Sequence, residues 1–322
     1  MSFTSRTSPR PPPPPPSKKR VGESLLEQLW FGEDDPDKAR DEASASVAAA
    51  TVLTTGLKPF PVFAARAITM LSSPSFSVKE VRGLIERDQA IATRVLRTAA
   101  SAAFRQRTPP ADLSDVIKRL GSKEVQAIIA SVATMEIFCD ETGLSARVRQ
   151  HSAATAALAR TLAHGTALSA EAFLCGLMHD IGKLMILQTG AAPYGDHGEA
   201  IEAPDAAHLT EREALRYDHA LLGAHVLGEW GFGEPVTTVV ALHHQPMKAH
   251  QQGTKIADLV AYVRVADRIE YLLRTYDGEE LEPICDALAQ DASAQHLGLD
   301  SAHLQAEWMD LVKARREMLS VR

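Results

Sequence analysis

Residues 174–183 read LCGLMHDIGK, an apolar run that delivers a histidine and an aspartate side by side before a glycine and a lysine. These residue types favour a helix that faces a core. Polar side chains are costly to bury there unless they are satisfied, so His179 and Asp180 require a metal ion or a hydrogen-bond network as partner. Lys183 follows His179 by one helical turn. This stretch therefore predicts a buried polar site inside a helical domain.

Further histidines and an aspartate that could complete such a site stand in similar apolar settings elsewhere. They are His151, His219, His243, His244 and Asp267. Imidazole nitrogens and carboxylate oxygens together suit iron, manganese or zinc. One ion held by His151, His179, Asp180 and Asp267 would leave positions for water and a phosphate oxygen. The other three histidines would make room for a second ion, with Asp180 as the bridge.

The residues alone leave two interpretations open. Taken singly, each histidine is more often a satisfied core group than a ligand. Five histidines and two aspartates in helical settings are harder to explain in that way. A polar core network would tolerate joint apolar replacement of its members, because removing all partners together is nearly neutral, whereas a metal site would not.

The composition indicates a helical globular protein. The chain has 322 residues with 45% hydrophobic content, enough for one large or two ordinary domains. Alanine and leucine are abundant and no hairpin or βαβ pattern occurs, which predicts an all-α fold. The net charge of -7 argues against nucleic acid as a partner. Three distant cysteines without CxxC spacing suggest a reducing compartment, and no apolar run approaches the length of about 20 residues that a membrane helix needs. We therefore expect a cytoplasmic protein.

The chain divides into four expected parts. Residues 1–42 form a proline-rich and then acidic leader without a core of its own, which we expect to be disordered. Residues 43–140 form a first helical subdomain, residues 141–280 a second one that carries all the candidate site residues, and residues 281–322 a helical extension. Residues 188–210 read as a surface loop. The expected helix N-caps are Ser77, Ser114, Ser169 and Thr210.

The pattern H…HD…D, formed by His151, His179-Asp180 and Asp267, resembles the HD superfamily of metal-dependent phosphohydrolases. The wider chain from Leu57 to Tyr276 resembles its HDOD branch, through LKPFP at 57–61, LIERD at 84–88, RVLRTA at 94–99, SAAF at 101–104 and LG at 120–121. The resemblance implies an all-helical fold in which a first helical subdomain packs on a second, HD-like bundle. It also implies a role in bacterial signalling.

HDOD members are generally taken to be non-enzymatic because many lack the metal ligands, whereas this sequence keeps them. His219 and His243-His244 also resemble the additional ligands of HD-GYP phosphodiesterases, which cleave cyclic dinucleotides. No Gly-Tyr-Pro segment follows His244, where QPMK stands at 245–248, and in this the chain departs from that group.

Three functions follow as hypotheses. The first is a bacterial signalling or regulatory HDOD protein that acts through protein partners and holds one or two divalent transition-metal ions. The second is a metal-dependent phosphohydrolase acting on a nucleotide or another phosphoester, with Asp180 and Lys183 as its catalytic residues. The third is nucleic-acid binding through the basic helices between Lys79 and Glu124, which the net negative charge opposes.

Overall fold

A computed structural model describes residues 60–73, 75–100, 110–137, 143–190, 192–194, 201, 206–250, 253–275 and 281–320. Among these residues the regular structure is helical and no strand occurs, so the predicted all-α class is confirmed. The leader expected at 1–42 lies outside the described residues, as does the expected subdomain boundary near residue 140. None of the described helices is both long and apolar enough to cross a membrane.

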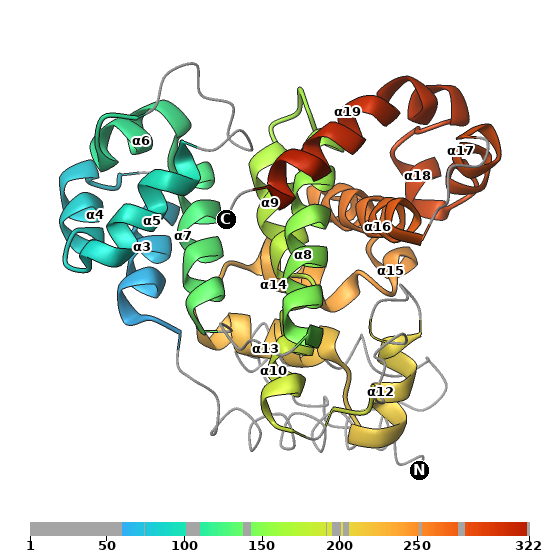
Figure 1. Cartoon of the computed structure of the whole chain (residues 1–322), viewed down its shortest axis with the longest axis horizontal. Coiled ribbons are helices and arrows are strands. Elements are labelled where there is room, and N and C mark those ends of the chain that lie inside the picture. The colour runs from blue at the N-terminus through green and yellow to red at the C-terminus, as the bar shows by residue number, and fades with distance from the viewer. Residues whose placement is uncertain are drawn as a thin grey trace, which may run out of the picture.

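A first group of helices lies on one side of the molecule (Figure 1). It contains α3 (Val62–Ser72), α4 (Val78–Ile85), α5 (Gln89–Ala99), α6 (Leu113–Leu120) and α7 (Ser122–Ile137). The prediction for Ser77 is confirmed, because its hydroxyl accepts a hydrogen bond from the Glu80 amide at 3.3 Å. The prediction for Ser114 is wrong. Leu113 is already helical and buried, so the cap of α6 must precede it, and Asp112 accepts a hydrogen bond from the Asp115 amide at 2.8 Å.

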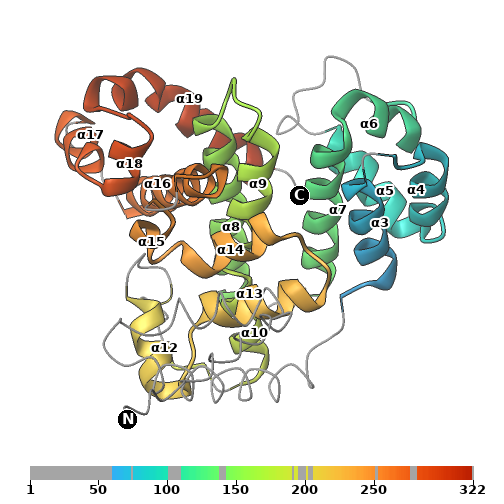
Figure 2. The same cartoon turned by 180° about the vertical axis from the view of Figure 1, so that it is seen from behind.

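The second group contains α8 (Gly143–Leu162) and the remaining helices. These are α9 (Ser169–Met178), α10 (Ile181–Gln188), α12 (Ala207–Leu215), α13 (His219–Glu229), α14 (Glu234–Leu242), α15 (Pro246–His250), α16 (Lys255–Thr275), α17 (Leu281–Ala289), α18 (Ala292–His296) and α19 (Ser301–Leu319). Seen from behind, α7 lies between the other helices of the first group and the second group (Figure 2). The fold is thus two packed helical subdomains.

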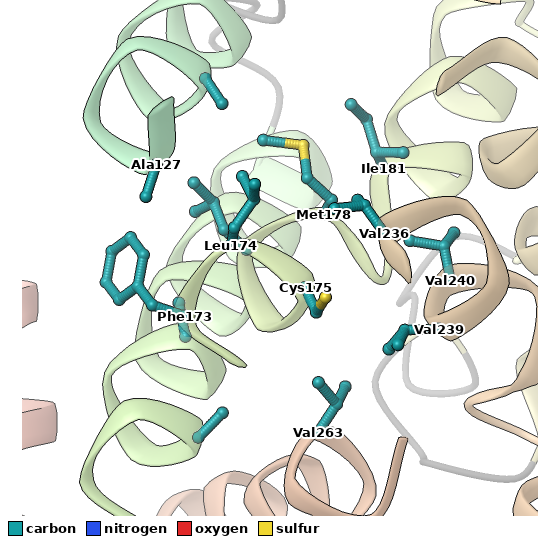
Figure 3. Close-up of a cluster of buried hydrophobic side chains, with 14 of the residues drawn as sticks. Ala127, Phe173, Leu174, Cys175, Met178, Ile181, Val236, Val239, Val240 and Val263 are labelled. Atoms are coloured by element: carbon teal, nitrogen blue, oxygen red, sulfur yellow. The ribbon is translucent and has the colours of Figure 1, made fainter. Parts of the chain in front are cut away.

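From Ala172 to Met178, helix α9 is apolar on all sides and occupies the centre of the core. A helix of this kind is stable only when neighbours cover every face. Figure 3 shows it between Ala127 of α7 on one side and Val239 of α14 and Val263 of α16 on the other. Helix α8 approaches it closely at Gly176, where a Cβ would lie 2.9 Å from the Ala156 Cα. The decisive stretch of sequence is therefore the most enclosed part of the fold.

The start and the end of α9 differ from what the sequence predicts. Ser169 does not cap α9, since its hydroxyl donates to the Arg160 carbonyl at 3.2 Å and so ties the start of α9 to α8. The helix expected to hold His179 and Asp180 ends at Met178, and α10 begins at Ile181. The pair thus lies at a junction between two helices.

The expectation for residues 188–217 is also corrected. Thr210 does not begin a helix, because α12 already starts at Ala207. The expected surface loop is correspondingly shorter, and Tyr194 and Ile201 within it are buried. Helix α12 ends before Arg216, which adopts a left-handed conformation with φ 69. A new helix, α13, then starts at His219 under a separate cap, Asp218.

Candidate metal centre

The structure brings the predicted site residues together from five places in the second subdomain. His151 comes from the middle of α8, His179 and Asp180 from the α9–α10 junction, His219 from the first turn of α13, His243 and His244 from the end of α14, and Asp267 from α16. We call these seven residues the His–Asp cluster. All are buried except His244, which is partly exposed.

The cluster contains two sets of potential ligands that share Asp180. In the first set, the Asp180 Oδ2 lies 3.3 Å from the His179 Nε2 and 3.5 Å from the His151 Nε2. These two imidazole nitrogens are 3.2 Å apart. Asp267 adjoins this set, with its Oδ1 at 3.1 Å from the His151 Nε2. The first set and the adjoining Asp267 are the four residues of the H…HD…D pattern.

The second set surrounds Oδ1, the other oxygen of the Asp180 carboxylate. The Asp180 Oδ1 is 3.2 Å from the His219 Nε2 and 3.8 Å from the His243 Nε2. The His244 Nε2 lies 2.9 Å from the His219 Nε2. One ligand atom from each residue of a set falls within 4.8 Å of the others, in both sets. Asp180 is therefore placed to bridge two ions.

In four of the five histidines of the cluster, the Nδ1 atom lies within hydrogen-bond distance of an acceptor outside the cluster. The Nδ1 of His179 lies 2.7 Å from the Gly176 carbonyl, and that of His243 lies 2.6 Å from the Val240 carbonyl. A carbonyl can only accept, so both Nδ1 atoms carry the proton. The Nδ1 atoms of His151 and His219 lie 3.0 Å from Glu270 and 2.7 Å from Glu211.

This arrangement turns every Nε2 toward the cluster. In a neutral imidazole whose Nδ1 is protonated, the Nε2 carries a lone pair. Lone pairs that converge at such short distances repel one another unless a cation lies between them. Histidines that bind metals characteristically donate their other ring nitrogen to a carboxylate or carbonyl, as these four do.

The electrostatics of the cluster separate its histidines into two kinds. Burial alone lowers the pKa of His151, but its hydrogen bonds to Asp267 and Glu270 outweigh burial and raise the pKa to about 10. Burial likewise lowers the pKa of His219, and the charge of Glu211 raises it to about 9. A proton and a metal ion therefore compete for the Nε2 of these two residues.

The surroundings of His243 and Asp180 keep these two side chains in the protonation states that bind metals. Burial and the neighbouring His244 hold the pKa of His243 well below its ordinary value, which keeps this imidazole neutral. Burial would raise the pKa of Asp180, but its interactions with His179 and Lys183 hold that pKa well below its ordinary value. A neutral imidazole and an ionised carboxylate are the forms that bind metals.

One buried atom tests whether these residues fit a metal ion. The Asp180 Oδ1 is buried and accepts no hydrogen bond from any described residue, although the His219 Nε2 lies 3.2 Å away. A buried carboxylate oxygen without a donor is costly. Together with the converging imidazoles, this oxygen supplies a mixed nitrogen and oxygen donor set that suits a divalent transition metal. The residues fit such an ion.

Lys183 lies beside the carboxylate that the two sets share. It is 3% exposed, and its Nζ donates to the Asp180 Oδ2 at 2.8 Å. Its charge therefore balances the shared carboxylate directly.

Sequence reasoning missed the groups behind the histidines. Glu211, on α12, accepts from both the His219 amide and its Nδ1, and Tyr194 donates to its other oxygen at 2.7 Å. Glu270, on α16, lies one turn after Asp267 and therefore on the same helix face, a spacing that could have revealed it. His208 of α12 stacks on His244 with ring centroids 4.5 Å apart.

Comparisons with known proteins bear on the family and the fold. The family model of the HDOD domain matches residues 57–246. A relative in Treponema pallidum (strain Nichols), described as uncharacterized, is 24% identical over 220 residues, which cover 65% of this chain. The match spans 40% of the length of that relative.

Solved structures show the same fold at low sequence identity. An HDOD domain protein of unknown function from Geobacter sulfurreducens superposes with a TM-score of 0.69 at 19% identity, covering 87% of this chain and 99% of the other. A candidate phosphohydrolase from Shewanella amazonensis SB2B gives 0.67 at 23%, covering 85% and 98%. A candidate signal transduction protein from Marinobacter aquaeolei VT8 gives 0.63 at 20%, covering 91% and 67%.

Proposed function

Because the chain belongs to the HDOD domain family, we propose that it is a regulatory protein whose second subdomain binds one or two divalent transition-metal ions and which acts through protein partners. Iron, manganese and zinc are the candidate ions. The observation that carries this proposal is the position of Asp180. Its Oδ2 faces the first set of imidazoles, and its Oδ1 faces the second. The ligands would be the residues of the His–Asp cluster.

The metal centre joins the helices that carry its ligands, and this supports a regulatory role. The junction of α9 and α10 also contacts the first subdomain through α7. The Thr134 Oγ1 of α7 lies 3.8 Å from the Met178 Sδ, next to His179, and Gln188 of α10 donates to the Ile137 carbonyl at 3.3 Å. Occupancy of the centre would therefore favour one arrangement of α7 against α9 and α10, which a partner protein can recognise.

The burial of the cluster favours regulation over turnover. Its residues other than His244 are at most 4% exposed. A phosphoester substrate must reach the metal-bound positions, and enclosed ligands restrict that access. A buried centre that stabilises one packing of helices needs no such access.

Elemental analysis of purified protein tests the metal centre. The protein is prepared without a metal-affinity tag, as wild type, as His179→Ala/Asp180→Ala, and as His164→Ala, which removes an exposed histidine outside the cluster. We expect one or two equivalents of a transition metal in the wild type and in His164→Ala, and none in the double variant. Wild type that stays metal-free after incubation with iron, manganese and zinc would contradict the proposal.

A metal-dependent phosphohydrolase is the second candidate, favoured by the complete ligand set and the partly exposed His244. A bound divalent ion would lower the pKa of water toward neutrality and polarise a phosphoryl oxygen. Asp180 would hold the ions, and Lys183 would keep this carboxylate ionised. A panel of nucleotides and phosphodiesters, incubated with metal-loaded wild type and with His179→Ala/Asp180→Ala, tests this. Turnover in the wild type alone would support it, and no turnover across the panel would contradict it.

A further inference from the structure

A continuous line of contacts leads from the His–Asp cluster to the C-terminal helix. The His151 Nδ1 lies 3.0 Å from the Glu270 Oε2. The other oxygen of the same carboxylate, Oε1, accepts a hydrogen bond at 3.1 Å from the Arg315 Nη2 of α19. Glu270 is 2% exposed, so its carboxylate is satisfied mainly by these protein partners. One buried carboxylate thus contacts a candidate metal ligand and a side chain of α19.

Helix α19 lies across α8 and beside α17, outside the stretch that matches the HDOD family (Figure 1). Within α19, whose residues are all described, the buried side chains are Leu304 and Leu311. Arg315 follows Leu311 by one turn, and its side chain is 24% exposed. Past Leu311, the last turns of α19 are held by the partly buried Met318, which packs against the core, and by the bond from Arg315 to Glu270.

Arg315 is placed to set the orientation of the Glu270 carboxylate. A carboxylate can rotate about its last bond, and a donor on one oxygen limits that rotation. Arg274 lies 3.6 Å from Oε2, the oxygen that faces His151, so it does not replace Arg315 on Oε1. Losing Arg315 would leave Oε2 free to turn from the His151 Nδ1.

We propose that the metal centre and the docking of α19 are coupled through Arg315, Glu270 and His151. This inference rests on the proposed metal centre and adds a regulated element to it. Docking of α19 orients His151 and strengthens metal binding. By reciprocity, metal binding strengthens docking of α19 by the same factor. A partner that displaces α19 would then weaken metal binding.

Zinc affinity of the full chain, measured by competition with a chelating dye, tests the coupling. Glu270→Gln removes an outer carboxylate and should weaken binding about 10- to 100-fold. Arg315→Gln should weaken zinc binding about 5-fold, which is the lower end of the range of coupling factors between two sites. Arg316→Gln, at the next and exposed position, should leave the affinity unchanged. In Glu270→Gln, adding Arg315→Gln should have no further effect, because the connection is already broken.

Amide hydrogen exchange of residues 301–320 supplies a second measurement that does not depend on activity. Zinc should slow exchange in the wild type and in Arg316→Gln. In Arg315→Gln the effect of zinc should disappear, and Arg315→Lys, which keeps the charge, should restore part of it. Wild type that binds none of zinc, iron and manganese would overturn the metal centre itself. Wild type that binds zinc while Arg315→Gln shows the same affinity and the same response to zinc would overturn only the coupling.

Discussion

Gly182 of α10 lies directly against the backbone of His219, the first residue of α13. A Cβ at position 182 would come within 2.0 Å of the His219 carbonyl oxygen. The two helices therefore approach more closely than any side chain would permit. Since Asp180 immediately precedes α10, this approach brings the His219 Nε2 to 3.2 Å from the Asp180 Oδ1. A glycine in the decisive stretch thus positions the second set of ligands.

Replacement of Gly182 by alanine should therefore separate α10 from α13. The added methyl group meets rigid backbone, so we expect a loss of about 3 kcal/mol in the free energy of unfolding, the upper end for overpacking. The His219 Nε2 would also move from Asp180, so the second set should lose its metal ion. Urea unfolding and metal content of Gly182→Ala measure the two effects.

Gly228→Ala is the matched control, because this glycine lies within α13 and a Cβ there meets no described atom within 4 Å. Alanine favours a helix over glycine, so Gly228→Ala should gain up to about 1 kcal/mol and keep its metal content. Equal losses in the two variants would contradict the importance of the close approach at Gly182.

Lys183→Met should destabilise the protein more without metal than with it. Lys183 donates to the buried Asp180, and removing one partner of a buried pair leaves an uncompensated charge, at a cost of about 3–5 kcal/mol. A bound cation would supply the missing positive charge. Thermal unfolding of chelator-treated and zinc-loaded protein measures the difference.

Lys313→Met, which removes a lysine whose side chain is 60% exposed, should change neither form by more than about 0.5 kcal/mol. If Lys183→Met were equally destabilised with and without zinc, its charge would not act on the metal site. If its apo stability were unchanged and only phosphoester turnover were lost, a direct role on phosphate would be favoured.

Asp112→Ala should cost about 1 kcal/mol, since the Asp112 carboxylate caps α6. Ser114→Ala should change the stability by less than about 0.5 kcal/mol, because Ser114 lies inside the helix. Urea unfolding of both variants compares the two positions. A larger loss at Ser114 would mean that the serine caps the helix in solution.

The sequence singles out the members of the cluster because they are expensive to bury. His179 and Asp180 stand out from the apolar run around them. Asp267 stands out less, because α16 also carries Asp258, Arg264 and Arg268. Helix starts are less predictable. Ser169 and Asp112 both have the side chains of N-caps, and only the packing of α9 against α8 directs the Ser169 hydroxyl to Arg160 instead.

Glu211, the carboxylate behind His219, was not predicted for a related reason. Glutamate is common on exposed helix faces, so a single Glu211 beside Arg212 and Glu213 reads as part of a solvated surface. Its burial follows from the break at Arg216, which folds α12 back toward the start of α13. No local pattern encodes that approach, because it depends on how two helices pack.

Glu211→Gln should weaken metal binding about 10- to 100-fold, because Glu211 orients His219 from behind. Its Oε2 accepts from the His219 Nδ1 at 2.7 Å and from the His219 amide at 2.6 Å. Burial would raise the pKa of Glu211, but the charge of His219 lowers it below its ordinary value and keeps it an acceptor. A glutamine cannot offer the same charge, so His219 loses basicity and orientation. Zinc competition with a chelating dye measures the affinity.

Glu213→Gln, an exposed position on the same helix, should bind zinc like the wild type. A second control separates positioning from general destabilisation. In His219→Ala the ligand is already absent, so adding Glu211→Gln should not lower the zinc affinity further, because neighbours in one network are not additive. If the two changes instead weakened zinc binding independently, Glu211 would act through the stability of α12 and not through the orientation of His219.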